Sequence, residues 1–148
     1  MKTSAKAVVI DASIALKWYL ADEELGEKAL RLLDFDLVTP PLLAYEVANG
    51  LVIARRRGRI DPGLVVRGLE GFHGLGIEMK EISALSERIV SLAEKYRLTA
   101  YDASYLALAE SEGLEFVTAD GDLHQRVKGD LAWVRLLSDF SNKATRLD

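Results

Sequence analysis

The chain has 148 residues with 49% hydrophobic and 28% charged side chains and a formal net charge of −4, and it contains no Cys and two His. This length predicts one domain over residues 1–148, with a polar tail at 138–148 that is frayed or used for contacts. The composition excludes a disulfide framework, a cysteine nucleophile and a multi-histidine zinc site, and the negative charge argues against gripping nucleic acid through overall positive charge.

The first apolar run, residues 7–10, is too short for a signal-peptide core and ends at Asp11. No span approaches the roughly 18 uncharged apolar residues of a membrane helix. We therefore expect a cytoplasmic protein with no membrane partner.

Apolar, β-rich runs alternate along the chain with helical patterns. Strands are predicted over residues 8–10, 37–38, 77–82, 116–117 and 133–134. Helices are predicted over residues 14–20, 24–33, 42–57, 62–72, 86–96, 101–112 and 122–127. Strands separated by helices predict an α/β fold with a five-stranded parallel sheet, in which ligands bind beyond the carboxyl ends of the strands.

Acidic residues follow two of the predicted strands. Asp11 comes directly after the first strand, and Asp120 comes shortly after the fourth, in the string Val117-Thr118-Ala119-Asp120. A purely structural role is possible for each, as the N-cap of the next helix or in a turn, because Asp is favoured at both positions. Asp122 could share or replace the role of Asp120.

Glu46 lies in an unusually apolar helical segment. Between residues 42 and 54 only Tyr45, Glu46, Asn49 and Gly50 interrupt the apolar pattern, so we expect this helix to be buried on most sides. Glu46 and Asn49 share a face, and a buried carboxylate there is costly unless it is paired, protonated or bound to a cation. The alternative is a solvated stripe on a half-exposed helix.

Asp102 is the single charged residue between Leu98 and Ala109, and with Thr99 it forms a pattern like a capping box. A structural cap would explain Asp102 taken alone. A parallel sheet could, however, bring Asp11, Glu46, Asp102 and Asp120 to one rim, and we call these four residues the acidic quartet. Clustered carboxylates repel one another and are tolerated mainly around hard divalent cations such as Mg²⁺ or Mn²⁺, which support hydrolysis of phosphodiesters.

Four strings in the chain resemble the PIN-domain ribonucleases, and most closely the VapC-type toxins of toxin-antitoxin modules. These strings are Val9-Ile10-Asp11-Ala12-Ser13, Tyr45-Glu46-Val47-Ala48-Asn49, Thr99-Ala100-Tyr101-Asp102-Ala103-Ser104-Tyr105 and Val117-Thr118-Ala119-Asp120. The resemblance implies a three-layer α/β/α fold, RNA cleavage dependent on Mg²⁺ or Mn²⁺, a homodimer and inhibition by a small cognate antitoxin similar to VapB. It also implies that the acidic quartet is both catalytic and metal-binding.

The same resemblance assigns lesser roles to polar residues beside the quartet. Ser13 matches a hydroxyl position that orients a carboxylate or a water, and Asn49 and Thr118 match polar positions next to the site. The positive run Arg55-Arg56-Arg57-Gly58-Arg59 closes the Glu46 helix. Its charge suits a helix C-terminus and solubility, but could also contact RNA phosphates or an acidic partner.

Three other functions remain open from the sequence. The first is a PIN-type nuclease that processes RNA outside a toxin system. The second is a receiver-like or phosphatase-like domain in which an Asp is phosphorylated. Against it, Asp11-Ala12-Ser13 lacks the second acid of the phosphatase type, and no Lys follows the later strands where a receiver needs one. The third is a binding module with an inert acidic pocket.

Overall fold

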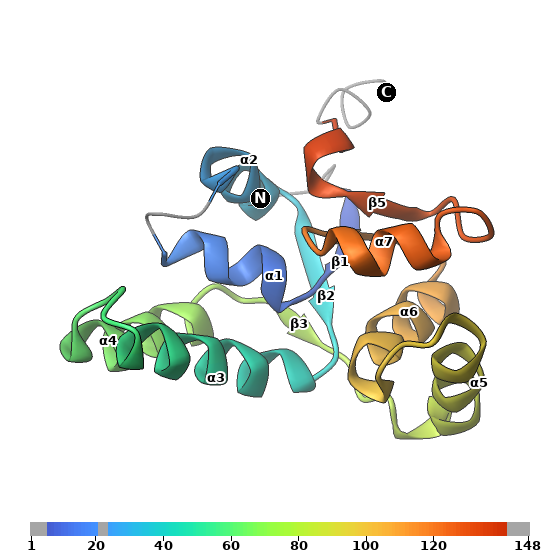
Figure 1. The fold of residues 1–148 in the computed structure, drawn as a ribbon, viewed down its shortest axis with the longest axis horizontal. Coiled ribbons are helices and arrows are strands. Elements are labelled where there is room, and N and C mark those ends of the chain that lie inside the picture. The colour runs from blue at the N-terminus through green and yellow to red at the C-terminus, as the bar shows by residue number, and fades with distance from the viewer. Residues whose placement is uncertain (1–5, 21–23, 142–148) are drawn as a thin grey trace.

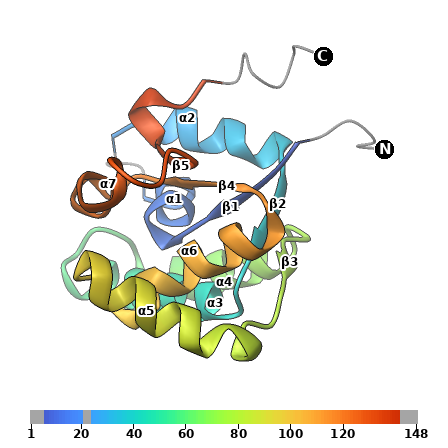
Figure 2. The same cartoon turned by 90° about the vertical axis from the view of Figure 1, so that its right-hand side faces the viewer.

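A computed structural model describes residues 6–20 and 24–141 of the chain. Its centre is a parallel sheet of five strands in the order β3-β2-β1-β4-β5 (Figures 1 and 2). The strands are β1 (Ala7–Ile10), β2 (Asp36–Thr39), β3 (Glu78–Met79), β4 (Glu115–Thr118) and β5 (Val134–Leu136). The sheet and the helices around it confirm the predicted α/β/α fold with a five-stranded parallel sheet.

The central strands carry the core. Val8, Val9 and Ile10 of β1 are fully buried, and Ile10 pairs in register with Val117 of β4. Such continuous apolar runs are typical of parallel strands that are covered on both faces. The pairing places the ends of β1 and β4 side by side, although more than a hundred residues separate them in the chain.

Helices cover the sheet and fill the crossovers between its strands. They are α1 (Ala12–Ala15), α2 (Gly26–Arg31), α3 (Leu42–Arg56), α4 (Pro62–His73), α5 (Ser86–Tyr96), α6 (Ala100–Glu112) and α7 (Gly121–Val127). In both views α5 lies beside α6 and α3 lies beside α4 (Figures 1 and 2). Within the described residues, each helix is too short or too polar to cross a lipid bilayer.

The structure shortens two predicted elements. The strand predicted over residues 77–82 is reduced to Glu78–Met79, which lie exposed at the edge of the sheet with one neighbouring strand to pair with. The helix predicted over residues 14–20 is an α-helical turn followed by a 3₁₀ turn, Leu16–Trp18. Apolar pattern alone could not reveal these limits, because edge pairing and turn type depend on the neighbouring elements.

The tail predicted from residue 138, to be frayed or used for contacts, makes contacts in its first residues. A 3₁₀ turn spans Leu137–Asp139, and Phe140 is buried with its ring centroid 5.7 Å from that of Phe35. Burial of this ring holds the chain in place as far as Phe140, because removing a large aromatic side chain from water contributes favourable free energy to folding. Residues 142–148 of the predicted tail lie outside the described residues.

The prediction that the Glu46 helix is buried on most sides is wrong. Its buried side chains, Leu43, Val47, Leu51 and Ala54, follow one stripe of α3. Tyr45, Asn49 and Ile53 recur at four-residue spacing on another stripe, and all three are exposed. Helix α3 therefore covers the core with one face and presents an open face to solvent.

Candidate active site

The topology brings the acidic quartet to the carboxyl edge of the sheet. Asp11 directly follows β1, and Asp120 lies two residues beyond β4. Glu46 lies in the second turn of α3, which starts shortly after β2. Asp102 lies in the first turn of α6, whose far end leads through Gly113 into β4, so the start of α6 is at the same edge of the sheet.

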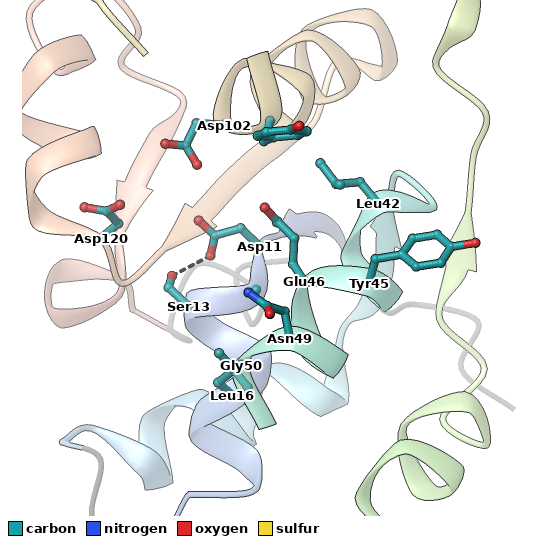
Figure 3. Close-up of a pocket in the computed structure, with 12 residues that line it drawn as sticks. Asp11, Ser13, Leu16, Leu42, Tyr45, Glu46, Asn49, Gly50, Asp102 and Asp120 are labelled. Atoms are coloured by element: carbon teal, nitrogen blue, oxygen red, sulfur yellow. Dashed lines mark hydrogen bonds between the residues drawn. The ribbon is translucent and has the colours of Figure 1, made fainter. Parts of the chain in front are cut away.

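All four carboxylates line one pocket of about 520 Å³. Its lining is Asp11, Ala12, Ser13, Leu16, Leu42, Tyr45, Glu46, Asn49, Gly50, Tyr101, Asp102 and Asp120. Figure 3 shows Asp11 between Glu46 and Asp120, with Asp102 above them in that view. The structure thus brings together four acids from four separate segments of the chain.

Asp11 is the most enclosed member of the quartet, with 6% of its surface exposed. The Ser13 hydroxyl donates a hydrogen bond to its Oδ1, and the Thr118 hydroxyl donates to its Oδ2 at 2.6 Å. Ser13 Oγ in turn accepts from the backbone N–H of Ala119 at 2.8 Å. Asp11 makes no side-chain cap to α1, so the capping interpretation fails for this residue and its carboxylate is held by hydroxyls from two segments.

Asp120 combines a structural and a pocket-lining role. Its Oδ1 accepts hydrogen bonds from the backbone N–H groups of Asp122 and Leu123 at 3.0 and 3.1 Å, so it caps α7 as its position after the strand suggested. The same carboxylate faces the pocket. The helix cap fixes the orientation of this carboxylate and does not compete with its place in the pocket.

Helix α6 is capped by Thr99, and this cap places Asp102. The Thr99 hydroxyl accepts from the backbone N–H of Asp102 at 3.0 Å. The cap predicted from the sequence is therefore present, and the side chain that forms it is the hydroxyl of Thr99. The Asp102 carboxylate lies in the favourable field of the helix N-terminus and lines the pocket.

Glu46 has a partner that sequence reasoning missed. The buried hydroxyl of Tyr105 donates a hydrogen bond to Glu46 Oε1, and the Tyr105 ring stacks on Phe116 of β4, with centroids 5.9 Å apart. A signal existed in the sequence, because a Tyr within the nearly continuous apolar run of α6 must find a partner for its hydroxyl. The sequence could not show that this partner lies on α3.

The electrostatics of the pocket are dominated by carboxylates. Burial raises the pKa of Asp11 to about 7, against the lowering effect of its two hydroxyl partners, and the neighbouring charges of Asp102 and Asp120 raise it further. Burial, followed by the charges of Asp120 and Glu46, also raises the pKa of Asp102. Among the described residues no Lys, Arg or His lines this pocket. Such a site favours protonation or a bound cation.

The chemistry of the donor set fits a hard divalent cation. Carboxylate oxygens are the preferred ligands of Mg²⁺ and Mn²⁺, and here they lack a cationic side chain to neutralise them. As the side chains lie, no three Asp, Glu or His groups in the described part of the chain converge on a common metal position. Mg²⁺ typically takes only one or two protein carboxylates and keeps several waters, so the pocket suits such partial coordination.

The remaining predicted residues lie close to the quartet in different environments. Asn49 lines the pocket from the exposed face of α3, and Thr118 is fully buried behind Asp11. Asp122 is outside the pocket lining and pairs with Arg126 at 3.0 Å, although its charge still raises the pKa of Asp102. Of the positive run, Arg59 lines an adjoining pocket of about 280 Å³ that shares Ser13, Leu16 and Gly50 with the acidic pocket.

Comparison with known protein families finds one match that spans most of the chain. Residues 8–129 match the family model of the PIN domain. The chain belongs to the PIN domain family. This PIN domain is 35% identical over 113 residues to VapC ribonuclease Mb0985 of Mycobacterium bovis, covering 76% of this chain and 85% of the relative. It is 32% identical over 123 residues to ribonuclease VapC3 of Pyrobaculum aerophilum, covering 80% and 93%. It is thus a VapC-type member of the family.

Solved structures share the architecture of this PIN domain. The crystal structure of PAE2754 from Pyrobaculum aerophilum aligns with a TM-score of 0.67 at 30% identity, covering 93% of both chains. A toxin-antitoxin complex from Klebsiella pneumoniae aligns with a TM-score of 0.64 at 20% identity, covering 90% of this chain and 99% of the other. The second likeness concerns the fold alone.

Burial of Asp11 predicts a pH dependence of stability in the metal-free protein. Its pKa in the fold, about 7, exceeds the ordinary value of 3.8, so its contribution to stability is fully present below pH 4 and is lost as the pH rises through 7. Asn does not titrate, so we expect Asp11→Asn to remove this pH dependence. The free energy of unfolding of the variant, relative to the parent, should rise by roughly 2 kcal/mol from pH 5 to pH 8. Urea unfolding in EDTA at both pH values measures the difference.

The matched control is Asp139→Asn, which changes an exposed carboxyl outside the pocket. We expect it to keep the same pH slope as the parent. Parallel stability profiles for Asp11→Asn and the parent would contradict the assigned environment of Asp11.

Proposed function

We propose that this PIN domain is a divalent-metal-dependent endoribonuclease that hydrolyses phosphodiester bonds of RNA. The observation that carries the proposal is the gathering of four carboxylates in a single pocket whose described lining contains no cationic side chain. The relatives named VapC ribonuclease and ribonuclease VapC3 support RNA as the substrate. A third relative, from Pyrobaculum aerophilum, is named exonuclease VapC9 and is 38% identical over 88 residues, so the mode of cutting needs a direct test.

We assign catalysis and metal binding to the acidic quartet, with Mg²⁺ or Mn²⁺ as the cofactor. When bound, such an ion lowers the pKa of a coordinated water and stabilises the charge that develops on the phosphodiester. Asp11 would lie at the floor of the site, where Ser13 and Thr118 fix both of its oxygens. Asp120 is oriented by its cap to α7, and Asp102 by the start of α6.

Other polar residues would support the quartet. Ser13 and Thr118 hold the Asp11 carboxylate, and Tyr105 holds one oxygen of Glu46. Asn49 lines the pocket beside Glu46 and could contact a substrate or a water. For Asp122 we propose a weaker role, through its charge near Asp102, because its own carboxylate pairs with Arg126.

Cleavage of RNA is the first test of this function. With Mg²⁺ or Mn²⁺ the purified protein should cut a circular single-stranded RNA, which has no end for an exonuclease to attack. Glu46→Gln and Asp102→Asn should lower the rate by at least about 100-fold, because each removes a charge that holds the cation. Gel analysis of labelled circular and linear RNA measures both effects.

Glu87→Gln is the matched control, since Glu87 is exposed on α5 and lies outside the pocket. We expect it to cut at the parental rate. Undiminished cutting by the quartet variants would remove the pocket from the mechanism, and cutting of linear RNA alone would show an exonuclease.

The Tyr105 hydroxyl provides a second test. Tyr105→Phe keeps the ring stacked on Phe116 but frees Glu46 Oε1. Loss of a group that orients a metal ligand typically weakens metal affinity by 10- to 100-fold, and we expect about 10-fold for Mn²⁺ by calorimetry with little change in thermal stability. Tyr96→Phe is the control, because it also removes a Tyr–carboxylate hydrogen bond, to Asp130 at 3.0 Å, outside the pocket. Equal Mn²⁺ affinity in the two variants would contradict this role.

We further propose that the protein is the toxin of a toxin-antitoxin pair and binds a small cognate antitoxin, as VapC-type proteins are expected to do. The alternative is an RNA-processing nuclease that lacks such a partner. Homodimerisation and a cytoplasmic location stay predictions from the sequence.

Expression in a bacterial host separates the toxin from the processing enzyme. We expect the parent to arrest growth, Asp11→Asn to be harmless, and co-expression of the small reading frame next to the gene to restore growth. Arrest that no neighbouring frame relieves, or growth unaffected by the parent while its RNA cleavage is intact, would favour a processing role.

A further inference from the structure

The exposed aromatic side chains of the chain are concentrated at the acidic pocket. The chain contains two Trp, five Tyr and four Phe, all within the described residues. Tyr45 and Tyr101 are exposed, by 74% and 61%, whereas every other aromatic side chain is buried or half-buried. Both exposed tyrosines line the pocket that holds the acidic quartet. A flat, partly apolar ligand surface would explain why these rings are left open at this place.

Each exposed ring is a direct neighbour of a catalytic acid in the chain. Tyr45 precedes Glu46 on α3, and Tyr101 precedes Asp102 on α6. Consecutive residues of a helix point about 100° apart, so each ring stands to the side of its acid and not over it. Figure 3 shows Tyr45 at the edge of the pocket, with its ring turned outward from the acids and with Glu46 and Asp11 between it and Asp120.

The pocket must hold a polyanion without basic side chains of its own. Among the described residues its lining contains no Lys or Arg, which would pair with the carboxylates and compete with a bound cation. Uncharged aromatic rings avoid this competition, because they bind the face of a nucleobase and leave the charge of the site unchanged.

We propose that Tyr45 and Tyr101 form a stacking subsite for unpaired nucleobases of the RNA strand whose phosphodiester lies over the acidic quartet. This inference rests on the proposed ribonuclease function and specifies its substrate. Stacking needs an exposed base face, which base-paired RNA does not offer, so the site takes single-stranded segments. Every base has such a face, so the rings provide affinity with little sequence preference.

Substitution of each ring tests the subsite. Tyr45→Ala and Tyr101→Ala should each raise the KM for a short single-stranded RNA by roughly 5- to 100-fold, the usual effect of losing one base stack, with a smaller change in kcat. Tyr45→Phe and Tyr101→Phe keep the ring and should stay within about threefold of the parent. Val66→Ala, at an apolar residue of α4 that is likewise 61% exposed but outside the pocket, should leave both constants unchanged.

An abasic RNA distinguishes the loss of base stacking from a general distortion of the pocket by the Ala substitutions. Removing single nucleobases next to the scissile bond should weaken binding to the parent, measured by fluorescence anisotropy in EDTA. The same removal should cost much less in the Ala variant of the ring that stacks on that base. An equal loss in parent and variant would overturn the proposal, and so would parental KM values in both Ala variants.

Two further outcomes separate this inference from its alternatives. If the Ala variants change the mass measured by light scattering but bind RNA with parental affinity per chain, the rings contact a second copy of the chain and the stacking proposal fails. If the parent cuts RNA and the Ala variants cut it equally well, the subsite fails while the ribonuclease function stands. If the parent neither binds nor cuts RNA with Mg²⁺ or Mn²⁺, the proposed function itself fails.

Discussion

Burial of one carboxylate, Asp11, beside three others is the constraint on which the functional part of this fold depends. Asp11 is almost enclosed, and the charges of Asp102 and Asp120 reinforce the effect of burial on its pKa. A core built for stability alone would place an apolar residue here, since an unpaired buried charge opposes folding. The fold instead supplies two hydroxyl donors to this carboxylate and leaves the pocket without cationic side chains. Its strongly buried central strands supply the stability that offsets this arrangement.

The sheet and the position of the acids could be predicted from the sequence because both follow from short-range rules. Apolar runs marked the strands, and an acid placed directly after a parallel strand must lie at the carboxyl edge. Asp120 and Thr99 also formed the caps that their positions suggested. The length of β3 and the exposed face of α3 could not be predicted from the sequence, because both depend on which neighbouring elements cover them. The packing of Phe140 against Phe35 has the same origin.

Within the site, sequence reasoning identified the charges but not all of the groups that hold them. The hydroxyls of Ser13 and Thr118 were recognised through family resemblance, and the structure shows the bonds they make. The bond from Tyr105 to Glu46 escaped prediction because it joins two helices whose rotation is set by packing. The exposed positions of Tyr45 and Tyr101 were hidden for the same reason. Residue types thus revealed the chemistry of the site, while the orientation of helices determined its shape.

The hydroxyl bonds around Asp11 tie the beginning of the chain to a segment more than a hundred residues later. A growing polypeptide that has reached only α6 already carries three of the four acids, but it lacks Thr118, Asp120 and the strand that aligns them. The pocket is therefore incomplete until most of the domain has left the ribosome tunnel. Synthesis order alone delays assembly of the pocket until β4 pairs with β1 and brings Thr118 and Asp120 to the other three acids.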